Sequence, residues 1–376
     1  MSEQQAEFRA ETRTDVPEQS TTGVLDEKLQ PGAAVEPGER TGRRGAGRGG
    51  RRGRRRRDEH QMVPDATFTS YYGRPVVKAS PWEADIPAYL FLGGLAGGSS
   101  LLGAGAQLTG RPVLRKVGRI GALSAITVSF AALVHDLGRP SRFVNMLRVA
   151  KPTSPMSVGT WILTMYGPLA GAAGAAELVA PFVDLVPKRL RFPLRLLVKA
   201  ASPAGLGAAL VGPAVASYTG VLLADTATPT WHAARKHLPF VFVGSAAAAS
   251  GGLGMLLSPP SEAGPARRLA LGGAVLELAV EHHMEGGMGI TAEPLHTGKP
   301  GMLMRASKAL TAIGAAGSLL AGRSRLAAAV SGTALLAGSA CTRFGIFHAG
   351  QASARDPKYT VVPQRERIER GEAAGA

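Results

Sequence analysis

The chain has 376 residues, 43 of them Lys or Arg and 27 Asp or Glu, which gives a formal net charge of +16. Hydrophobic residues make up 45% of the chain, aromatic residues only 5%, and 49 residues are Gly. The single cysteine, Cys341, excludes an internal disulfide, and it excludes a four-cysteine iron–sulfur site or a covalent c-type haem held by these residues alone.

The first 70 residues fall into two blocks of opposite charge. Residues 1–39 carry 3 Lys/Arg against 9 Asp/Glu, and residues 40–57 carry 10 Arg with Gly between them and no acid. Such segments cannot bury enough apolar surface to offset chain entropy, so we expect residues 1–70 to be a disordered tail. The Arg block lacks interleaved aromatic residues, which favours attraction to anionic membrane lipids over nucleic-acid binding.

From residue 81 onward, apolar runs alternate with short basic loops. Four uncharged runs have 24 or 25 residues: 86–110, 152–176, 200–224 and 238–261. At 1.5 Å per residue, each is long enough to cross a hydrocarbon core of about 30 Å. Shorter or more polar candidates follow at 120–135, 269–280, 309–322 and 326–342. We therefore predict an all-α, multi-pass protein of the cell membrane with a bundle of about eight transmembrane helices; a soluble Ala-rich helical protein is the less favoured interpretation.

Glycines recur at spacings of three and four residues in the predicted helices, as in Gly93-Gly94 and Gly97-Gly98. Small residues at this spacing let helix backbones approach closely in lipid, where packing drives association. An even number of spans places both chain ends on one side of the membrane, which we call the terminal face.

Ionisable residues gather at the terminal face. Asp85 and Tyr89 stand four residues apart at the start of the first span, so they share one helical face. His135 and Asp136 close the second span, and Tyr218 lies near the end of the fourth. Ionisable groups next to an apolar stretch are costly and mark a candidate functional site.

Two further aromatic residues, Tyr166 and Trp231, have a simpler explanation. Tyr and Trp are enriched where a membrane protein meets the lipid–water interface. We expect both to belong to such an interfacial belt.

Four motifs occur in one order along residues 81–350: Tyr89-Leu-Phe-Leu-Gly-Gly, His135-Asp-Leu-Gly-Arg-Pro, Ser154-Pro-Met-Ser and Tyr218-Thr-Gly-Val-Leu-Leu. In these motifs the chain resembles the NrfD/PsrC family, the membrane subunits of polysulfide-reductase-like molybdoenzyme complexes. The resemblance implies eight helices, menaquinone or a related quinone as a non-covalent cofactor, and no haem or iron–sulfur cluster in this chain. It also implies two partners, an iron–sulfur electron-transfer subunit and a molybdopterin catalytic subunit.

The resemblance further implies that Asp85, Tyr89, Asp136 and Tyr218 belong to the quinone site. Asp85 and Tyr89 depart from the best-known member, which has amide and imidazole groups there. The chemistry agrees, because a quinone needs an apolar slot, hydrogen-bond donors such as Tyr or His135, and a group that exchanges protons.

Asp136 has a second interpretation, a structural ion pair with Arg139 or Arg142. We assign both arginines to partner docking, because an Arg past the helix end reaches outward.

Glu277, Glu281 and Glu285 repeat every four residues and therefore share one helical face. We expect them to pair with one of three basic residues: Arg267, Arg343 or Lys308. A proton path through Glu277 and Glu281 is the less favoured interpretation. Adjacent His282 and His283 point about 100° apart on a helix, so we expect no metal site.

These observations predict three regions: a tail over 1–70, a transmembrane domain over 81–350 and a polar C-terminal tail over 351–376. The predicted function is a quinone-binding membrane anchor, inactive alone, that passes electrons between an iron–sulfur subunit and the quinone pool. The alternative is a polytopic transporter or channel. Two observations argue against it: the polar residues cluster at one face, and the sequence shows no inverted repeat.

Overall fold

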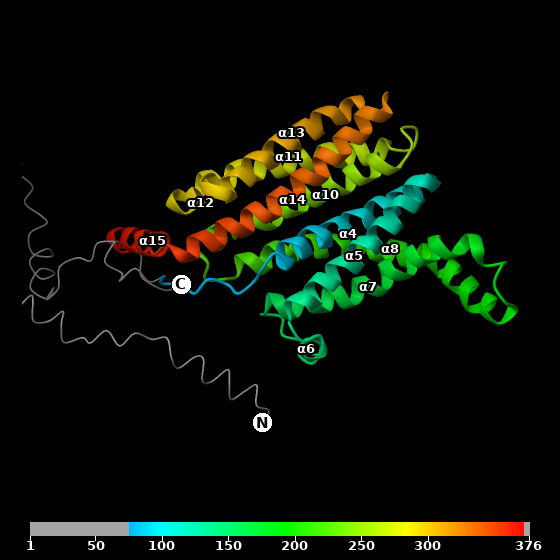
Figure 1. Cartoon of the computed structure of the whole chain (residues 1–376), viewed down its shortest axis with the longest axis horizontal. Helices are drawn as coiled ribbons and strands as arrows, with labels where there is room; N and C mark the ends of the chain where they lie inside the picture. Colours follow the sequence, from blue (N-terminus) through cyan, green and yellow to red (C-terminus); the bar gives the residue numbers. More distant parts are fainter. Residues whose placement is uncertain (1–74, 372–376) are drawn as a thin grey trace, which may run out of the picture. The chain divides into compact units, whose positions relative to one another are not determined.

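The computed structural model describes residues 75–371, and all regular elements in this range are helices (Figure 1). The predicted tail over 1–70 lies outside the described residues. Within that range eight helices have 20 or more residues: α4 (Asp85–Leu108), α5 (Pro112–Asp136), α7 (Pro155–Val179), α8 (Lys188–Ala224), α10 (Leu238–Leu257), α11 (Gly264–Gly287), α13 (Gly298–Leu320) and α14 (Arg325–Arg355). The shorter elements are α6 (Arg142–Met146), η2 (Ala180–Phe182), α9 (Pro229–Ala233), η3 (Gly289–Ala292), α12 (Glu293–His296) and α15 (Lys358–Glu369).

Five helical segments are long and apolar enough to cross a membrane: α4, α5, α7 with η2, α8 and α10. The all-helical membrane fold is therefore confirmed for the described part of the chain. Helices α11, α13 and α14 are long but more polar, because they carry groups such as Glu277, Lys308 and Arg343. The count of eight spans stays a prediction.

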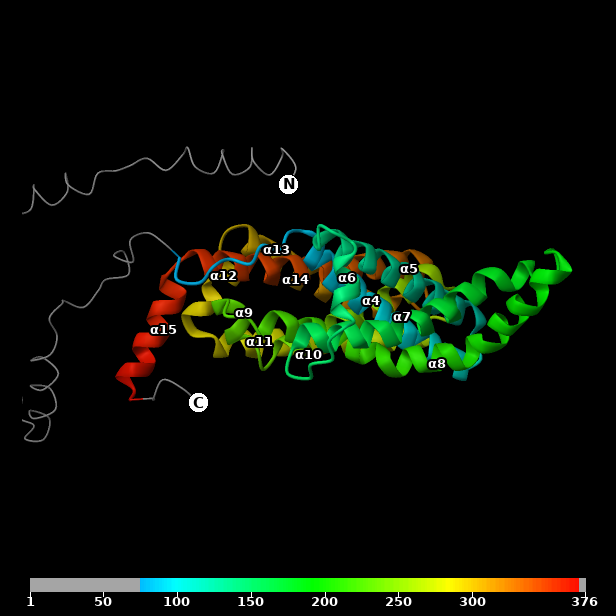
Figure 2. The same cartoon turned by 90° about the horizontal axis from the view of Figure 1, so that it is seen from below.

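The long helices run side by side, with consecutive helices antiparallel (Figure 1). At the terminal face, where α4 begins and α14 ends, Gln351 of α14 donates a hydrogen bond to the Ser80 carbonyl at 3.0 Å. The short helices α9, α12 and α15 gather at this end of the bundle (Figure 2). Helix α14 continues to Arg355, past the predicted domain boundary at 350, and the polar residues after it form α15.

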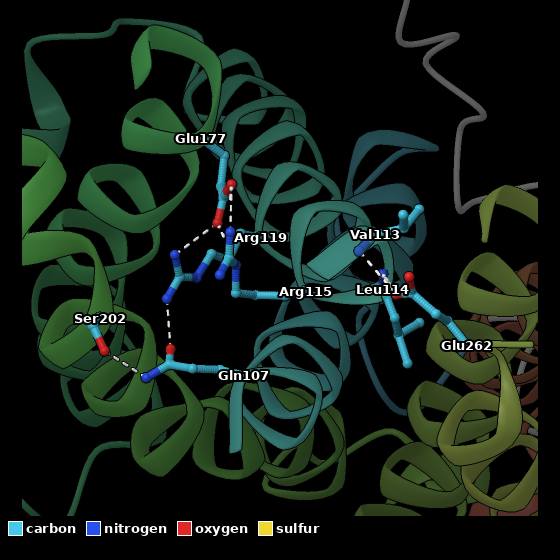
Figure 3. Close-up of polar contacts among 8 residues, drawn as sticks. All are labelled: Gln107, Val113, Leu114, Arg115, Arg119, Glu177, Ser202 and Glu262. Carbon is cyan, nitrogen blue, oxygen red and sulfur yellow. Dashed lines mark hydrogen bonds and ion pairs between the residues drawn. The ribbon is translucent and has the colours of Figure 1, made fainter. Parts of the chain in front are cut away.

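A polar network holds the opposite end of the bundle together (Figure 3). Glu177 of α7 accepts from Arg119 at 2.7 Å and from Arg115 at 2.9 Å, both on α5. Arg119 also donates to Gln107 of α4 at 2.5 Å, and Gln107 donates to Ser202 of α8 at 2.5 Å. The Arg119 guanidinium and Gln107 thereby link four helices. These partners explain why the first turns of α5 contain basic residues that we predicted to lie in a loop.

The N-terminus of α5 is capped from a distant part of the chain (Figure 3). The Glu262 carboxylate, in the turn between α10 and α11, accepts from the backbone N–H groups of Val113 and Leu114 at 2.9 and 3.0 Å. A carboxylate there satisfies free N–H groups and complements the helix dipole. The α5 helix therefore begins at Pro112, eight residues before the predicted segment.

Trp231 and Tyr166 do not belong to an interfacial belt, and that prediction is wrong. Both side chains are fully buried in the bundle. The Trp231 indole N–H donates to the Ile346 carbonyl at 2.8 Å, and the Tyr166 hydroxyl lies 2.7 Å from the Ser100 hydroxyl. Each polar atom has a protein partner, which allows a large aromatic side chain to be buried between helices.

Helix α4 is the central helix of the first half of the bundle, and glycines form its contacts. A Cβ atom added at Gly97 would overlap the Gly212 carbonyl oxygen of α8, and one added at Gly118 of α5 would lie 2.7 Å from Gly103. At Gly98 an added Cβ would overlap the Ser250 hydroxyl of α10. The predicted role of these glycines in close helix packing is confirmed at these positions.

This packing predicts opposite effects for two Gly→Ala substitutions in α4. Gly97→Ala should lower the thermal midpoint of the detergent-solubilised protein, because the α4 and α8 backbones must separate. Gly105→Ala should leave it unchanged or raise it, because an added Cβ there meets nothing within 4 Å and Ala favours a helix over Gly by about 1 kcal/mol. Equal midpoints for the two variants would contradict the role of Gly97.

Candidate functional site

Asp85 and His135 meet at the terminal face, as the sequence predicted for residues of one face. Asp85 is the first residue of α4 and His135 the penultimate residue of α5, and His135 Nδ1 lies 2.7 Å from Asp85 Oδ2. His135 is exposed, so the pair contributes little to stability. A carboxylate and an imidazole in direct contact with solvent can instead exchange protons with water.

Asp136 is half-buried next to this pair, at the last residue of α5. Among residues 75–371 it forms no salt bridge with Arg139 or Arg142, so the alternative interpretation of Asp136 as part of an ion pair is wrong for this structure. Both arginines are exposed. Arg142 donates instead to the Leu137 carbonyl at 3.2 Å and stabilises the turn that follows α5.

Tyr89 lies one helical turn deeper than Asp85 and lines a cavity of about 470 Å³ between α4, α5, α6 and α7. The other lining residues are Leu123, Ile126, Thr127, Ser129, Phe130, Phe143, Leu147, Leu163, Thr164, Gly167, Pro168 and Gly171. The lining is mostly apolar, and the volume is within the range of about 300–1,000 Å³ that small-molecule sites occupy.

Most hydroxyl groups around this cavity already have a hydrogen-bond partner within the protein. Thr127 and Thr164 donate to carbonyl groups of their own helices at 2.8 Å, and Ser129 donates to the Tyr89 carbonyl at 3.1 Å. The Tyr89 hydroxyl has no hydrogen-bond partner in the part of the chain that the structure describes. Tyr89 is therefore the hydroxyl donor most available to a ligand in the cavity.

Small residues form one wall of the cavity, and aromatic residues form another. A Cβ atom added at Gly167 or Gly171 of α7 would meet nothing within 4 Å, so these glycines leave open space. Phe143 of α6 packs edge-to-face on Phe130 of α5, with ring centroids 4.9 Å apart. The cavity therefore has open space along α7 and an aromatic wall formed by α5 and α6.

The sequence did not single out Phe130, Phe143 and Leu147 as site residues. Phe143 and Leu147 stand four residues apart next to the α6 helix, which is a signal for one shared helical face. That signal is weak in a five-residue helix, and only the fold brings α6 beside the cavity.

Tyr218 of α8 is buried in the same core cluster as Tyr89, but it does not line the cavity. Its ring packs on Gly159 of α7, where an added Cβ would lie 2.7 Å from Tyr218 Cδ2. The structure thus brings Asp85, His135 and Tyr89 into one region. It places the Tyr218 ring against Gly159 of α7, outside the lining of the cavity. A direct contact of Tyr218 with a ligand stays a prediction.

Residues 76–259 match the family model for polysulphide reductase, NrfD. The NrfD segment runs from just before α4 to just after α10, so it contains the cavity, the Asp85–His135 pair and all five candidate membrane spans. No curated protein matches the chain.

The NrfD match over residues 76–259 and the five apolar helices identify the chain as an integral membrane protein. NrfD proteins are membrane subunits of polysulfide-reductase-like oxidoreductase complexes. The predictions of family and localisation are confirmed. Helices α11, α13 and α14 lie beyond the NrfD segment, and they contain Glu277, Glu281 and Arg343.

Proposed function

We propose that the chain is the quinone-binding membrane anchor of an oxidoreductase complex, and that it passes electrons between an iron–sulfur partner and the menaquinone pool. The observation that carries the proposal is the cavity of about 470 Å³ into which Tyr89 is directed, one turn below the Asp85–His135 pair. The anchor is inactive alone, because electrons reach the quinone only through a partner subunit.

The cavity residues fit a quinone. A quinone has a planar apolar ring, two carbonyl acceptors and an apolar tail, and when bound it accepts two electrons and two protons. The Tyr89 hydroxyl would donate a hydrogen bond to one carbonyl, and Phe130 and the glycine wall of α7 would contact the ring. Asp136 and the Asp85–His135 pair would exchange the protons with the terminal face.

The partners proposed from the family are an iron–sulfur subunit that docks at the terminal face and a molybdopterin subunit bound to it. Arg139 and Arg142 are exposed in the turn directly after α5, beside the end of the quinone cavity. An exposed basic turn attracts an acidic surface of a partner. This position keeps the iron–sulfur centre of the partner close to the quinone.

A transporter or channel is the less favoured function. Across α4 to α10 the Asp, Glu, Lys and Arg residues lie outside the long uncharged stretches, such as 86–110 and 200–224, rather than along a path through the membrane. The buried charges of the later helices are a separate feature.

The Tyr89 hydroxyl is tested by Tyr89→Phe in the intact complex. A neutral hydrogen bond contributes about 0.5–1.5 kcal/mol, so the KM for quinone should rise by up to about tenfold with assembly unchanged. Tyr166→Phe is the matched control: that hydroxyl bonds Ser100 and does not line the cavity, so the KM for quinone should stay at the wild-type value. An unchanged KM in Tyr89→Phe would remove Tyr89 from the quinone site.

Asp136→Asn tests the proton-exchanging group. The substitution keeps the shape of the side chain and removes the acid, so the variant complex should assemble yet lose most quinone-linked turnover. A general acid or base typically contributes about 10²- to 10⁴-fold. Reduction of the partner's clusters by its own substrate, measured in the same membranes, should survive. Wild-type quinone turnover in the variant would leave Asp136 with a structural role only.

A further inference from the structure

A second set of ionisable groups lies inside the bundle, in the helices beyond the NrfD segment. Glu277 and Glu281 of α11 are each 1% exposed, and Arg343 of α14 is 0% exposed. Buried charges are expensive and are retained in membrane helices where they have a function or a close partner. Nothing in the quinone proposal uses these three groups.

The outer end of this set reaches solvent at the terminal face. Lys308 of α13 lies 2.8 Å from Glu285 and 3.5 Å from Glu281, and His296 lies 3.9 Å from Glu285. Lys308 is 37% exposed and His296 is 54% exposed, so water reaches Glu285 through them. The predicted pairing of these glutamates with Lys308 is confirmed.

The inner end is a network of hydroxyl groups around Glu277. Glu277 accepts from the Thr342 hydroxyl at 2.6 Å, and Thr342 lies 2.6 Å from the Ser307 hydroxyl of α13. Arg343 donates to the Phe242 carbonyl of α10 at 2.7 Å, and its guanidinium lies 3.9 Å above the Phe242 ring.

The groups that face Glu277 and Glu281 come from four helices. They are Ser245 on α10, Ser307 and Lys308 on α13, Thr342 and Arg343 on α14, and Glu285 on α11 itself. On the α4 side, an added Cβ at Gly94 would lie 3.4 Å from Arg343 Nη2. Arg343, at the inner end of this row of charged residues (Glu285, Glu281, Glu277 and Arg343), therefore lies against α4 at Gly94. The neighbouring Gly93 faces Ser129 and Val215 instead.

Several atoms of the row have no hydrogen-bond partner within the described residues. They are one carboxylate oxygen of Glu277, both carboxylate oxygens of Glu281, and two nitrogens of Arg343. At the opposite end of the bundle, by contrast, both carboxylate oxygens of Glu177 accept hydrogen bonds from Arg115 or Arg119. An open set of buried acids is instead typical of groups that bind protons and ordered water.

We propose that Glu285, Glu281 and Glu277 form a proton path that runs from the terminal face into the bundle and ends beside Arg343. Successive carboxylates are about 6 Å apart along α11, a distance that one water molecule bridges. In each step an O–H bond breaks at the outer donor and another forms at the next carboxylate inward, and no electron moves. Arg343 stops the path, because its positive charge opposes the passage of a further cation.

Infrared spectroscopy of the full-length chain in lipid vesicles tests the path without partner or quinone. The wild-type protein should show protonated-carboxyl absorption that shifts when the outer solvent is changed from H₂O to D₂O. Glu277→Gln and Glu281→Gln should each lose part of that absorption, and both should fold, because a neutral amide replaces a neutral acid. Glu177→Gln should leave the absorption unchanged, because Glu177 is an ionised member of a closed ion pair.

Two outcomes would overturn the proposal. If neither Glu277→Gln nor Glu281→Gln reduces the absorption, both carboxylates are ionised and the row is a structural salt-bridge cluster. If the lost absorption belongs to groups that do not exchange with D₂O, the row is not connected to solvent. Either result leaves the quinone proposal untouched, since this measurement requires no quinone.

Discussion

The structure depends on the close contact of α4 with its neighbours through glycine. At Gly97 and Gly212 the backbones of α4 and α8 meet without side chains between them. Gly98 lies against Ser250 of α10, and Gly103 lies against the backbone of α5 at Gly118. In lipid, where apolar burial gives little preference for one helix partner over another, such contacts determine which faces pack. They fix α4 in the middle of the bundle and direct Tyr89 and Gly94 to opposite functional regions.

The same residue type has two roles that sequence spacing does not distinguish. Gly97 of α4 is covered by the Gly212 backbone of α8, whereas Gly167 and Gly171 of α7 face open space and help to form the cavity. Both sets recur at three- or four-residue spacing. Spacing predicts that a helix can approach another closely. Whether a neighbouring helix fills the space beside a given glycine or leaves it open depends on the fold.

Local patterns predicted most of the helices and one contact of the site. The meeting of Asp85 with His135 followed from their positions at adjacent helix ends, and the shared face of Glu277 and Glu281 followed from their spacing. Long-range contacts were not predictable. Helix α5 begins early because Glu262 caps it, and it accommodates Arg119 because Glu177 lies opposite, some 58 residues later in the chain.

The two proposed sites lie on either side of α4. The cavity that we assign to a quinone lies among α4, α5, α6 and α7 in the NrfD segment, and the glutamates that we assign to a proton path lie among α10, α11, α13 and α14. Each proposed site has ionisable groups near it that contact solvent at the terminal face: the Asp85–His135 pair one turn from Tyr89, and Lys308 beside Glu285. The proposed redox partner at that face would therefore be near both sites.

The most direct test of the account is the quinone content of the purified complex after extraction with organic solvent. We expect menaquinone in near-stoichiometric amount with the wild-type chain. We expect much less with Gly171→Leu, in which a side chain fills the open wall of the cavity. The absence of quinone from the wild-type complex, or equal amounts in the two proteins, would contradict the assignment of this cavity.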